Sequence, residues 1–268
     1  MPILSTSTGP LHYEVFDATA PWVDDPGTIV FQHGIGAHPG IWSEWLPALI
    51  DRFRIVRFDM RGSGRSHIPP KGFPWTLDLL TEDLVAVADA TGTRRMHVVG
   101  ESMGGTIALN AALAHPDRVE SLTVSNGADV GSPIRRVQAW ARQMDEGGVK
   151  AWSDGMMADR FHPGAVDGPK RDWYARQQAA WTRNAILDAL QVLRDTNLRS
   201  RLPEVKCPVL LMHGDGSPFI PVSVMAEMHA ALPDSRLQVF AHARHGLPFS
   251  HARECAAALR AFLDAVAS

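Results

Sequence analysis

Short β-branched runs alternate with helical patterns along the chain, and this alternation constrains the fold more than any other feature. Strand patterns are predicted at residues 11–16, 28–31, 54–58, 96–99, 121–124, 209–212 and 237–240. Helical patterns are predicted at residues 42–49, 76–90, 104–114, 222–231 and 251–266. Strands that alternate with helices predict βαβ units, and the first strands predict an antiparallel pair at one edge. We therefore expect a three-layer α/β domain with a largely parallel sheet.

One long segment, residues 132–201, breaks this rhythm because it contains helical patterns and no strand pattern. Its helices are predicted at residues 134–144, 149–158 and 172–193. No repeat or low-complexity linker sets the segment apart as an independent domain. The sequence thus predicts a core formed by residues 1–131 and 202–268, with residues 132–201 as a helical cap insertion between two strands.

Charge and hydropathy exclude several classes of partner. The formal net charge is −3, and basic and acidic residues are interspersed, which gives no field suited to nucleic acid or to an anionic membrane. No cationic start precedes an apolar run at the N-terminus, and no stretch is apolar for about 18 residues. We expect a cytoplasmic protein with a small-molecule substrate, and the sequence leaves open whether it forms a homo-oligomer.

Metal and disulfide chemistry is not expected. Cys207 and Cys255 lie in neither a C-x-x-C nor a metal-spaced pattern. The 12 histidines include no H-E-x-x-H motif and no pair at helical spacing beside carboxylates. No cofactor is implied by any motif.

The stretch from Val98 to Ala108 carries the clearest chemical signal. An apolar strand runs into Gly100-Glu101-Ser102-Met103-Gly104 and then into a helix of small residues. A serine can be presented on a sharp strand-to-helix turn only if the positions two before and two after it lack bulk. The helix that follows aims its N-terminal dipole at developing negative charge. The pattern predicts Ser102 as a nucleophile.

A serine hydroxyl needs a base to take its proton, so a histidine is expected on a later loop. The loop after the last predicted strand carries His242, His245 and His251. His242 lies close to the strand end, and His251 is expected to open the terminal helix. We therefore predict that His245 is the base.

An oxyanion formed at an acyl carbon needs two preorganised N–H donors, worth several kcal/mol in the transition state. Met103 offers the amide directly after the nucleophile. The second donor is expected from the loop His33-Gly34-Ile35-Gly36, where the glycines let the backbone approach a substrate. Ile35 is the candidate donor.

These motifs together resemble the α/β-hydrolase family, and the resemblance covers essentially the whole chain. It rests on the His33-Gly34 loop, the Asp59–Ser66 turn, the elbow from Gly100 to Gly105 and the late His245. It implies the α/β-hydrolase fold, in which the serine comes first and the histidine last along the chain. The Asp59–Ser66 turn is expected to be scaffold without a chemical role.

The helical insertion is similar to the cap of 3-oxoadipate enol-lactonases, a subgroup that opens a lactone of a dicarboxylic acid. The similarity involves Arg135-Arg136, Gly155-Met156-Met157 and Arg160-Phe161. The predicted cap also contains the bulky apolar residues Trp140, Trp152 and Trp181, and it has a further cation at Arg183. An arginine pointing inward would favour a carboxylate-bearing substrate, because guanidinium and carboxylate form a forked pair.

The resemblance also implies an aspartate in a loop of the form G-x-x-D-x-x-x-P, and here the sequence departs from it. Residues 214–221 place the uncharged Ser217 where the acid should be. Loss of the acid from such a triad can cost about 10⁴ in rate, so a substitute is expected. Asp215, between two glycines on the same loop, is favoured over Asp129, which follows an earlier strand.

The leading function is hydrolysis of a small carboxylic ester or lactone through an acyl-enzyme on Ser102, with water then activated by His245. Two alternatives remain open. One is hydrolysis of a carbon–carbon bond in a vinylogous diketone from aromatic degradation, which can use the same serine and histidine. The other is a ligand-binding protein with little turnover, which the uncharged Ser217 favours.

Overall fold

The computed structural model describes residues 2–24, 26–131 and 137–267. Its sheet has the strand order β1-β2-β4-β3-β5-β6-β7-β8, and only the β1–β2 and β2–β4 pairs are antiparallel. The fold class is therefore confirmed as a mostly parallel α/β sheet. The strands are β1 (Ile3–Leu4), β2 (Leu11–Phe16), β3 (Thr28–Gln32), β4 (Arg54–Phe58), β5 (Met96–Glu101), β6 (Val119–Ser125), β7 (Val209–Gly214) and β8 (Ser235–Phe240).

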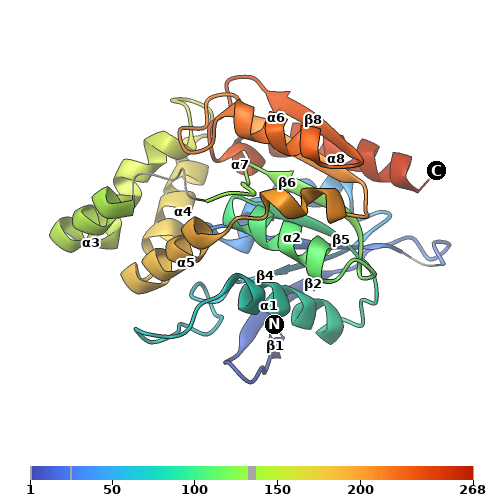
Figure 1. Cartoon of the computed structure of the whole chain (residues 1–268), viewed down its shortest axis with the longest axis horizontal. Coiled ribbons are helices and arrows are strands. Elements are labelled where there is room, and N and C mark those ends of the chain that lie inside the picture. The colour runs from blue at the N-terminus through green and yellow to red at the C-terminus, as the bar shows by residue number, and fades with distance from the viewer. Residues whose placement is uncertain (1, 25, 132–136, 268) are drawn as a thin grey trace.

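Helices cover both faces of this sheet (Figure 1). On one face α1, α2 and α6 share an apolar cluster that includes Leu84, Ile107 and Met225. On the other face η1 and α8 pack around Trp42 and Leu259. The bounds are η1 (Pro39–Ala48), α1 (Leu77–Ala90), α2 (Met103–Ala114), α6 (Val222–Ala231), α7 (Leu247–Ser250) and α8 (Ala252–Val266).

Three helices, hereafter the cap helices, lie between β6 and β7 in the chain and group together beside the sheet (Figure 1). They are α3 (Val137–Arg160), α4 (Gly168–Ala179) and α5 (Arg183–Asp195), and a short helix η2 (Arg199–Glu204) follows them. α3 is interrupted at Gly148, which has φ 73°. The predicted start of its first helix, at residue 134, lies outside the described residues.

The prediction of one helix over residues 172–193 is wrong in its bounds, because the structure has two helices there. α4 ends at Ala179, and α5 begins after Thr182, whose side chain accepts a hydrogen bond from the N–H of Ala185 at 3.2 Å. Such an N-cap satisfies an amide that the new helix leaves free, so it starts a helix where periodicity alone suggests continuity. The helix predicted at residues 42–49 likewise falls in a 3-10 helix that ends at Ala48, and its Pro47 lacks the N–H that an α-helical turn requires.

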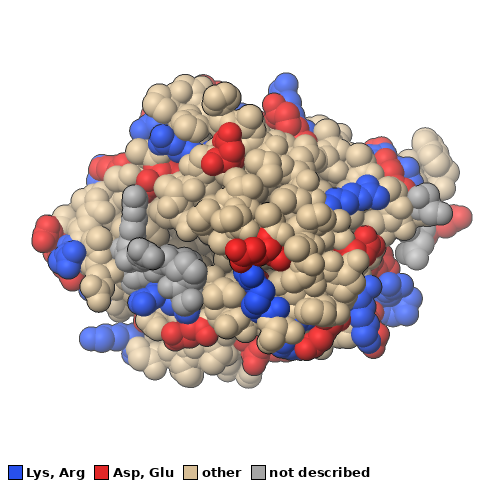
Figure 2. Space-filling view, turned by 45° about the horizontal axis from the view of Figure 1, so that its top comes forward, with Lys and Arg blue, Asp and Glu red and all other residues tan. Residues whose placement is uncertain are grey.

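Charges are mixed over the surface as they are in the sequence. Figure 2 shows Lys and Arg side chains lying among Asp and Glu side chains across the face in view. Within the described ranges no group of three His, Cys, Asp or Glu side chains is arranged to hold a metal ion. In the same ranges, no helix combines the length and the apolar character needed to cross a bilayer.

Candidate active site

Ser102 lies on the turn between β5 and α2 in a conformation that L-residues rarely adopt, with φ 55° and ψ −123°. The glycines on either side of it make this turn possible. A Cβ on Gly100 would lie 2.2 Å from the carbonyl oxygen of Gly104, and a Cβ on Gly104 would lie 2.3 Å from the carbonyl oxygen of Gln32. Both contacts are far too short for carbon, so the G-x-S-x-G spacing has the steric cause expected from the sequence.

Of the three late histidines, the structure brings His245 to Ser102. Its Nε2 lies 2.9 Å from Ser102 Oγ, and the side chain is buried in the loop that follows β8. His242 is exposed, and His251 occupies the N-cap position of α8, so it opens this helix as expected. Because residues 102 and 245 sit on loops at the same edge of the sheet, folding joins groups that are 143 positions apart.

The surroundings of His245 favour its neutral form. Burial, the nearby Arg160 guanidinium and His213 hold the pKa of His245 well below its usual value of 6.5. Desolvation penalises the imidazolium, and neighbouring positive charge adds to the penalty. The imidazole is therefore unprotonated at neutral pH and available to accept the Ser102 proton.

The other ring nitrogen of His245 faces a hydroxyl rather than a carboxylate. Its Nδ1 lies 3.2 Å from Ser217 Oγ. Since Nε2 must accept the proton of Ser102, Nδ1 carries the ring hydrogen and donates it to Ser217. The ring of Phe219 meets the imidazole edge-on, with centroids 4.8 Å apart and planes at 84°. Ser217 thus occupies the place of the acid both in the sequence pattern and in space.

Asp215, the favoured substitute for the acid, does not reach the base. Its Oδ1 accepts a hydrogen bond from the N–H of Ala243 at 3.3 Å, and no ion pair joins it to His245. The expectation that the flanking glycines let this residue turn inward is corrected by the backbone. The N–H groups of Asp215 and Gly216 donate to Phe240 at 3.1 Å and Ala243 at 2.9 Å, which fixes the loop.

Asp129, the second candidate, is committed to a different partner. Its carboxylate is buried and forms a two-point pair with Arg199, whose Nη2 lies 3.1 Å from Oδ1. The Asp129 carbonyl also accepts from the N–H of Leu198 at 2.8 Å. Asp129 therefore ties the end of β6 to the segment that leads out of the cap helices.

We predict that Asp215→Asn changes kcat/KM by no more than about threefold, because the amide keeps an oxygen for the Ala243 N–H and no catalytic contact is lost. Asp129→Asn is expected to lower the free energy of unfolding by about 1–3 kcal/mol, because Arg199 loses its charged partner. Ester hydrolysis and urea denaturation of both variants check these results. A loss of about 10³-fold or more in Asp215→Asn would make that residue the acid after all.

The oxyanion loop, residues 33–36, is held by its own histidine. The N–H of Met60 donates to His33 Nε2 at 3.0 Å, so the ring hydrogen lies on Nδ1 and is donated to the carbonyl of Gly34 at 2.9 Å. Burial lowers the pKa of His33 to about 4, so this tautomer persists at neutral pH. The Gly34 carbonyl and the Ile35 N–H belong to one peptide group, and His33 therefore fixes the direction of the Ile35 donor.

The two expected oxyanion donors remain free to bind a substrate oxygen. Among the described residues, no protein atom accepts a hydrogen bond from the N–H of Ile35. Met103 is the first residue of α2, so its N–H has no acceptor within the helix. A Cβ on Gly34 would lie 2.7 Å from the Cβ of Ser102, which shows how closely the loop packs on the serine.

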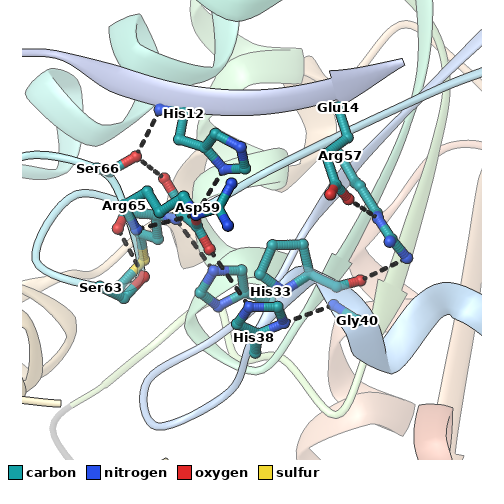
Figure 3. Close-up of polar contacts among 12 residues, drawn as sticks. His12, Glu14, His33, His38, Gly40, Arg57, Asp59, Ser63, Arg65 and Ser66 are labelled. Carbon is teal, nitrogen blue, oxygen red and sulfur yellow. Dashed lines mark hydrogen bonds and ion pairs between the residues drawn. The ribbon is translucent and has the colours of Figure 1, made fainter. Parts of the chain in front are cut away.

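The Asp59–Ser66 turn lies next to this loop, and its residues contact one another and β2 (Figure 3). Asp59 Oδ2 lies 2.8 Å from His12 Nδ1, and Ser66 Oγ donates to the Asp59 carbonyl at 2.6 Å. A Cβ on Gly64 would lie 2.3 Å from the Asp59 carboxylate. These contacts join the turn to β2, in keeping with a scaffold role.

Sequence reasoning missed Glu101, the residue between Gly100 and Ser102. Its side chain is 1% exposed; Oε2 accepts from the N–H of Gly34 at 2.9 Å, and Oε1 lies 3.4 Å from Arg160 Nη1. The same Oε1 is 4.0 Å from His245 Nε2. Burial raises the pKa of Glu101, whereas Arg160 and the Gly34 N–H oppose that rise. The available signal was an acidic residue at the end of a buried strand.

A small apolar cavity opens beside Ser102 and His245. Its volume is about 40 Å³, which is room for roughly three water molecules at about 10–15 Å³ each. The walls come from the core and the cap helices, and the described lining includes the charged cap residue Arg160. The apolar lining consists of Ile35, Ala128, Trp140, Trp152, Met156, Leu190, Leu193, Phe219 and Ile220.

The cap arginines differ in where they point. Arg160 is 2% exposed and faces the cavity, but its charge is paired with Glu101. Arg183 forms a surface pair with Asp145. Arg135 and Arg136 lie outside the described residues. Among the described residues that line the cavity, Arg160 is the cation that the cap helices supply, and a carboxylate already balances it.

The strained serine turn, at the end of a strand inside a mostly parallel sheet, defines the α/β-hydrolase fold. A family model described as alpha/beta hydrolase fold matches residues 27–252, and the chain belongs to this family. The resemblance seen in the sequence is thereby confirmed.

Curated relatives span nearly the same length as this chain. The protein named "Putative carbamate hydrolase RutD" from Caulobacter sp. (strain K31) is 28% identical over 96% of this chain and 97% of its own. The pimeloyl-[acyl-carrier protein] methyl ester esterase of Nitrosomonas europaea is 29% identical over 82% of this chain and 89% of its own.

Solved structures agree on the fold. An enol-lactonase from Burkholderia xenovorans LB400 superposes with a TM-score of 0.87 at 23% identity, covering 98% of this chain and 100% of its own. A hydrolase from Pseudomonas aeruginosa PA01 superposes with a TM-score of 0.84 at 26% identity, covering 98% and 97%. These solved structures show the fold, and the two curated relatives are named a putative carbamate hydrolase and a methyl ester esterase.

Proposed function

We propose that this protein hydrolyses a small carboxylic ester or lactone through an acyl-enzyme on Ser102. The observation that carries the proposal is the 2.9 Å contact between Ser102 Oγ and an uncharged, buried His245. As Oγ attacks the carbonyl carbon, His245 Nε2 takes its proton, and the Ile35 and Met103 amides bind the oxyanion. Collapse expels the alcohol, which takes the proton from Nε2. Water, activated by the same nitrogen, then releases the acid and frees Ser102.

The cavity supports a small and uncharged acyl group. A volume of about 40 Å³ suits an acyl chain of a few heavy atoms, and most of the lining is aliphatic or aromatic. Because Glu101 already neutralises Arg160, a second carboxylate in the cavity would compete for a paired guanidinium. Acetyl and propionyl esters are therefore better candidates than esters of dicarboxylic acids.

The names of the relatives support the same reaction class. A carbamate and a methyl ester both present a carbonyl carbon to a nucleophile, so the proposed acyl step fits either bond. Carbamates thus belong in any substrate test of this chain. No contact of the described residues favours the carbon–carbon bond hydrolase over the esterase. The Ser217 hydroxyl at Nδ1 is also compatible with a ligand-binding protein, whereas the contact between Ser102 and His245 favours the esterase.

A fluorophosphonate probe combined with a substrate panel tests the proposal. We expect one phosphonyl group per chain, located by mass spectrometry on the peptide that contains Ser102. In the panel, acetyl esters, small lactones, alkyl carbamates, dicarboxylate monoesters and a vinylogous diketone are compared by product analysis, and short neutral esters should react fastest. An unlabelled protein with no turnover would favour the binding protein, and a dienoate plus an acid from the diketone would favour carbon–carbon cleavage.

A further inference from the structure

The last turn of α3 touches both loops that the proposed reaction uses. The side chain of Arg160, the final residue of α3, donates from Nη2 to the carbonyl of Ile35 at 2.6 Å and from Nη1 to Glu101 at 3.4 Å. The backbone carbonyl of Arg160 accepts a hydrogen bond from the N–H of Gly246 at 2.9 Å. The carbonyl of Asp159 accepts one from the N–H of His245 at 3.4 Å. One turn of a cap helix therefore contacts both the oxyanion loop and residues 241–246, the loop that carries His245 and is hereafter called the base loop.

The oxyanion loop is held at three consecutive peptide groups. Glu101 accepts the Gly34 N–H, His33 donates to the Gly34 carbonyl, and Arg160 donates to the Ile35 carbonyl. The Ile35 N–H lies in the middle of these three groups. His33 holds the peptide group of this N–H directly, and Glu101 and Arg160 hold the peptide groups on either side of it. The direction of the donor therefore depends on the Glu101–Arg160 pair as well as on His33.

The Arg160 guanidinium is itself held by the cap helices, so it can fix the position of the oxyanion loop relative to them. Its Nε donates to Gln178 Oε1 at 3.2 Å, and the amide of Gln178 donates to the Ser153 carbonyl at 3.1 Å. Both partners are buried and belong to the cap helices α3 and α4. A planar fork with five N–H groups can bind three acceptors in fixed directions, whereas lysine, a point charge on a flexible stem, does not reproduce this geometry.

The base loop is packed just as closely against the same turn. A Cβ on Gly246 would lie 2.3 Å from the ring of Phe161 and 2.9 Å from the Arg160 carbonyl. The side chain of Arg244 also donates a hydrogen bond, from Nη1, to the carbonyl of Ala158. The backbone on both sides of His245 therefore rests on residues 158–161.

We infer that Arg160 is a positioning residue, which locks the oxyanion loop to the end of α3 while the same helical turn holds the base loop. In this arrangement the cap helices hold the oxyanion donor and the base in place, and they also line the cavity. The inference rests on the proposed function, because it assigns Arg160 to the oxyanion and base loops of that reaction. It places no bond between Arg160 and the substrate.

The test compares Arg160→Met, Arg160→Lys and the double variant Arg160→Met/Glu101→Gln with the wild type. For a short neutral ester we expect kcat to fall about 10- to 100-fold in each, with KM changed by less than about threefold, because misplacement weakens transition-state contacts rather than binding. The double variant removes both charges, so it stays informative if Arg160→Met leaves Glu101 buried and unpaired and does not fold. Arg183→Met, at a surface pair of α5, is the matched control and should keep wild-type rates.

Amide hydrogen exchange provides a readout that does not depend on turnover. We expect residues 33–37 and 244–247 to exchange at least about tenfold faster in Arg160→Met, while β5 and β6 keep their protection. Unchanged exchange and unchanged kcat would overturn the inference even if the probe labels Ser102. A loss confined to the KM of dicarboxylate monoesters would instead make Arg160 a substrate ligand. A wild type that fails to label would refute the proposed function, and exchange in the variants would still decide the positioning role.

Discussion

Ser102→Ala is expected to lower kcat/KM for a short ester by about 10⁴- to 10⁶-fold, the range seen when the nucleophile of a serine triad is removed. The hydroxyl is the group that His245 contacts at 2.9 Å, and no other described hydroxyl meets Nε2. Alanine keeps the Cβ of serine, so the turn at φ 55° experiences no new steric demand. Steady-state rates with a chromogenic ester, together with thermal unfolding to verify the fold, measure the effect.

His245→Ala serves as the companion variant. Groups that act as one unit are strongly non-additive, so the double variant Ser102→Ala/His245→Ala should be about as slow as either single variant. If the losses in kcat/KM of the two single variants multiply in the double variant, the two residues act independently and the proposed proton transfer is wrong. Activity above about 1% of wild type in Ser102→Ala would assign the nucleophile to another residue.

Ser217→Asp is expected to raise kcat/KM about 10- to 100-fold. The wild-type hydroxyl lies 3.2 Å from Nδ1 and orients the ring, but it carries no charge to stabilise the imidazolium that forms in the transition state. A carboxylate at this position supplies that charge, and its absence from a comparable triad costs about 10⁴ in rate. The loop is shaped around serine, so only part of that factor should be recovered.

The same substitution should move the acid limb of the pH–rate profile upward. The reaction needs a neutral His245, so activity falls as the pH drops through the pKa of this residue. In the wild type burial and Arg160 hold that pKa well below 6.5, and the plateau therefore extends into mildly acidic solution. A carboxylate beside Nδ1 favours the imidazolium and raises the pKa, so Ser217→Asp loses activity at a higher pH than the wild type does.

Two neutral variants separate charge from size at this position. Ser217→Asn matches aspartate in shape without its charge, and Ser217→Ala removes the hydroxyl. We expect neither to exceed the wild-type rate. Equal gains in Ser217→Asn and Ser217→Asp would show that side-chain length rather than charge limits the wild-type triad. No gain with aspartate would mean that Ser217 does not stand in for the acid.

Much of the fold was predictable because its signals are local. Each strand expected from β-branched runs is present, and the helices flanking them agree within a few residues. β1 was missed because its two residues are too few for a periodic pattern, and the gap between α4 and α5 was missed because a single threonine cap marks it. Such short features lie below the length over which periodicity can be recognised.

The acid position could not be derived in the same way. The glycines beside Asp215 suggested freedom to turn, whereas hydrogen bonds to Phe240 and Ala243 hold that backbone in place. Those partners lie on β8 and the base loop, so the restraint exists only after β7 and β8 have paired. Ser217 reaches Nδ1 for the same reason.

The sequence by itself determined the steric features of this protein: a serine flanked by glycines, a late histidine and an alternation of strands and helices. These are local, because each depends on neighbouring residues and on backbone conformation. Only the tertiary structure decided the electrostatic environment, in which a hydroxyl meets Nδ1, Asp129 binds Arg199, and Glu101 binds Arg160 across 59 positions. Charge pairing depends on distances that the folded chain alone sets, and the direction of each buried side chain follows from packing rather than from its place in a motif.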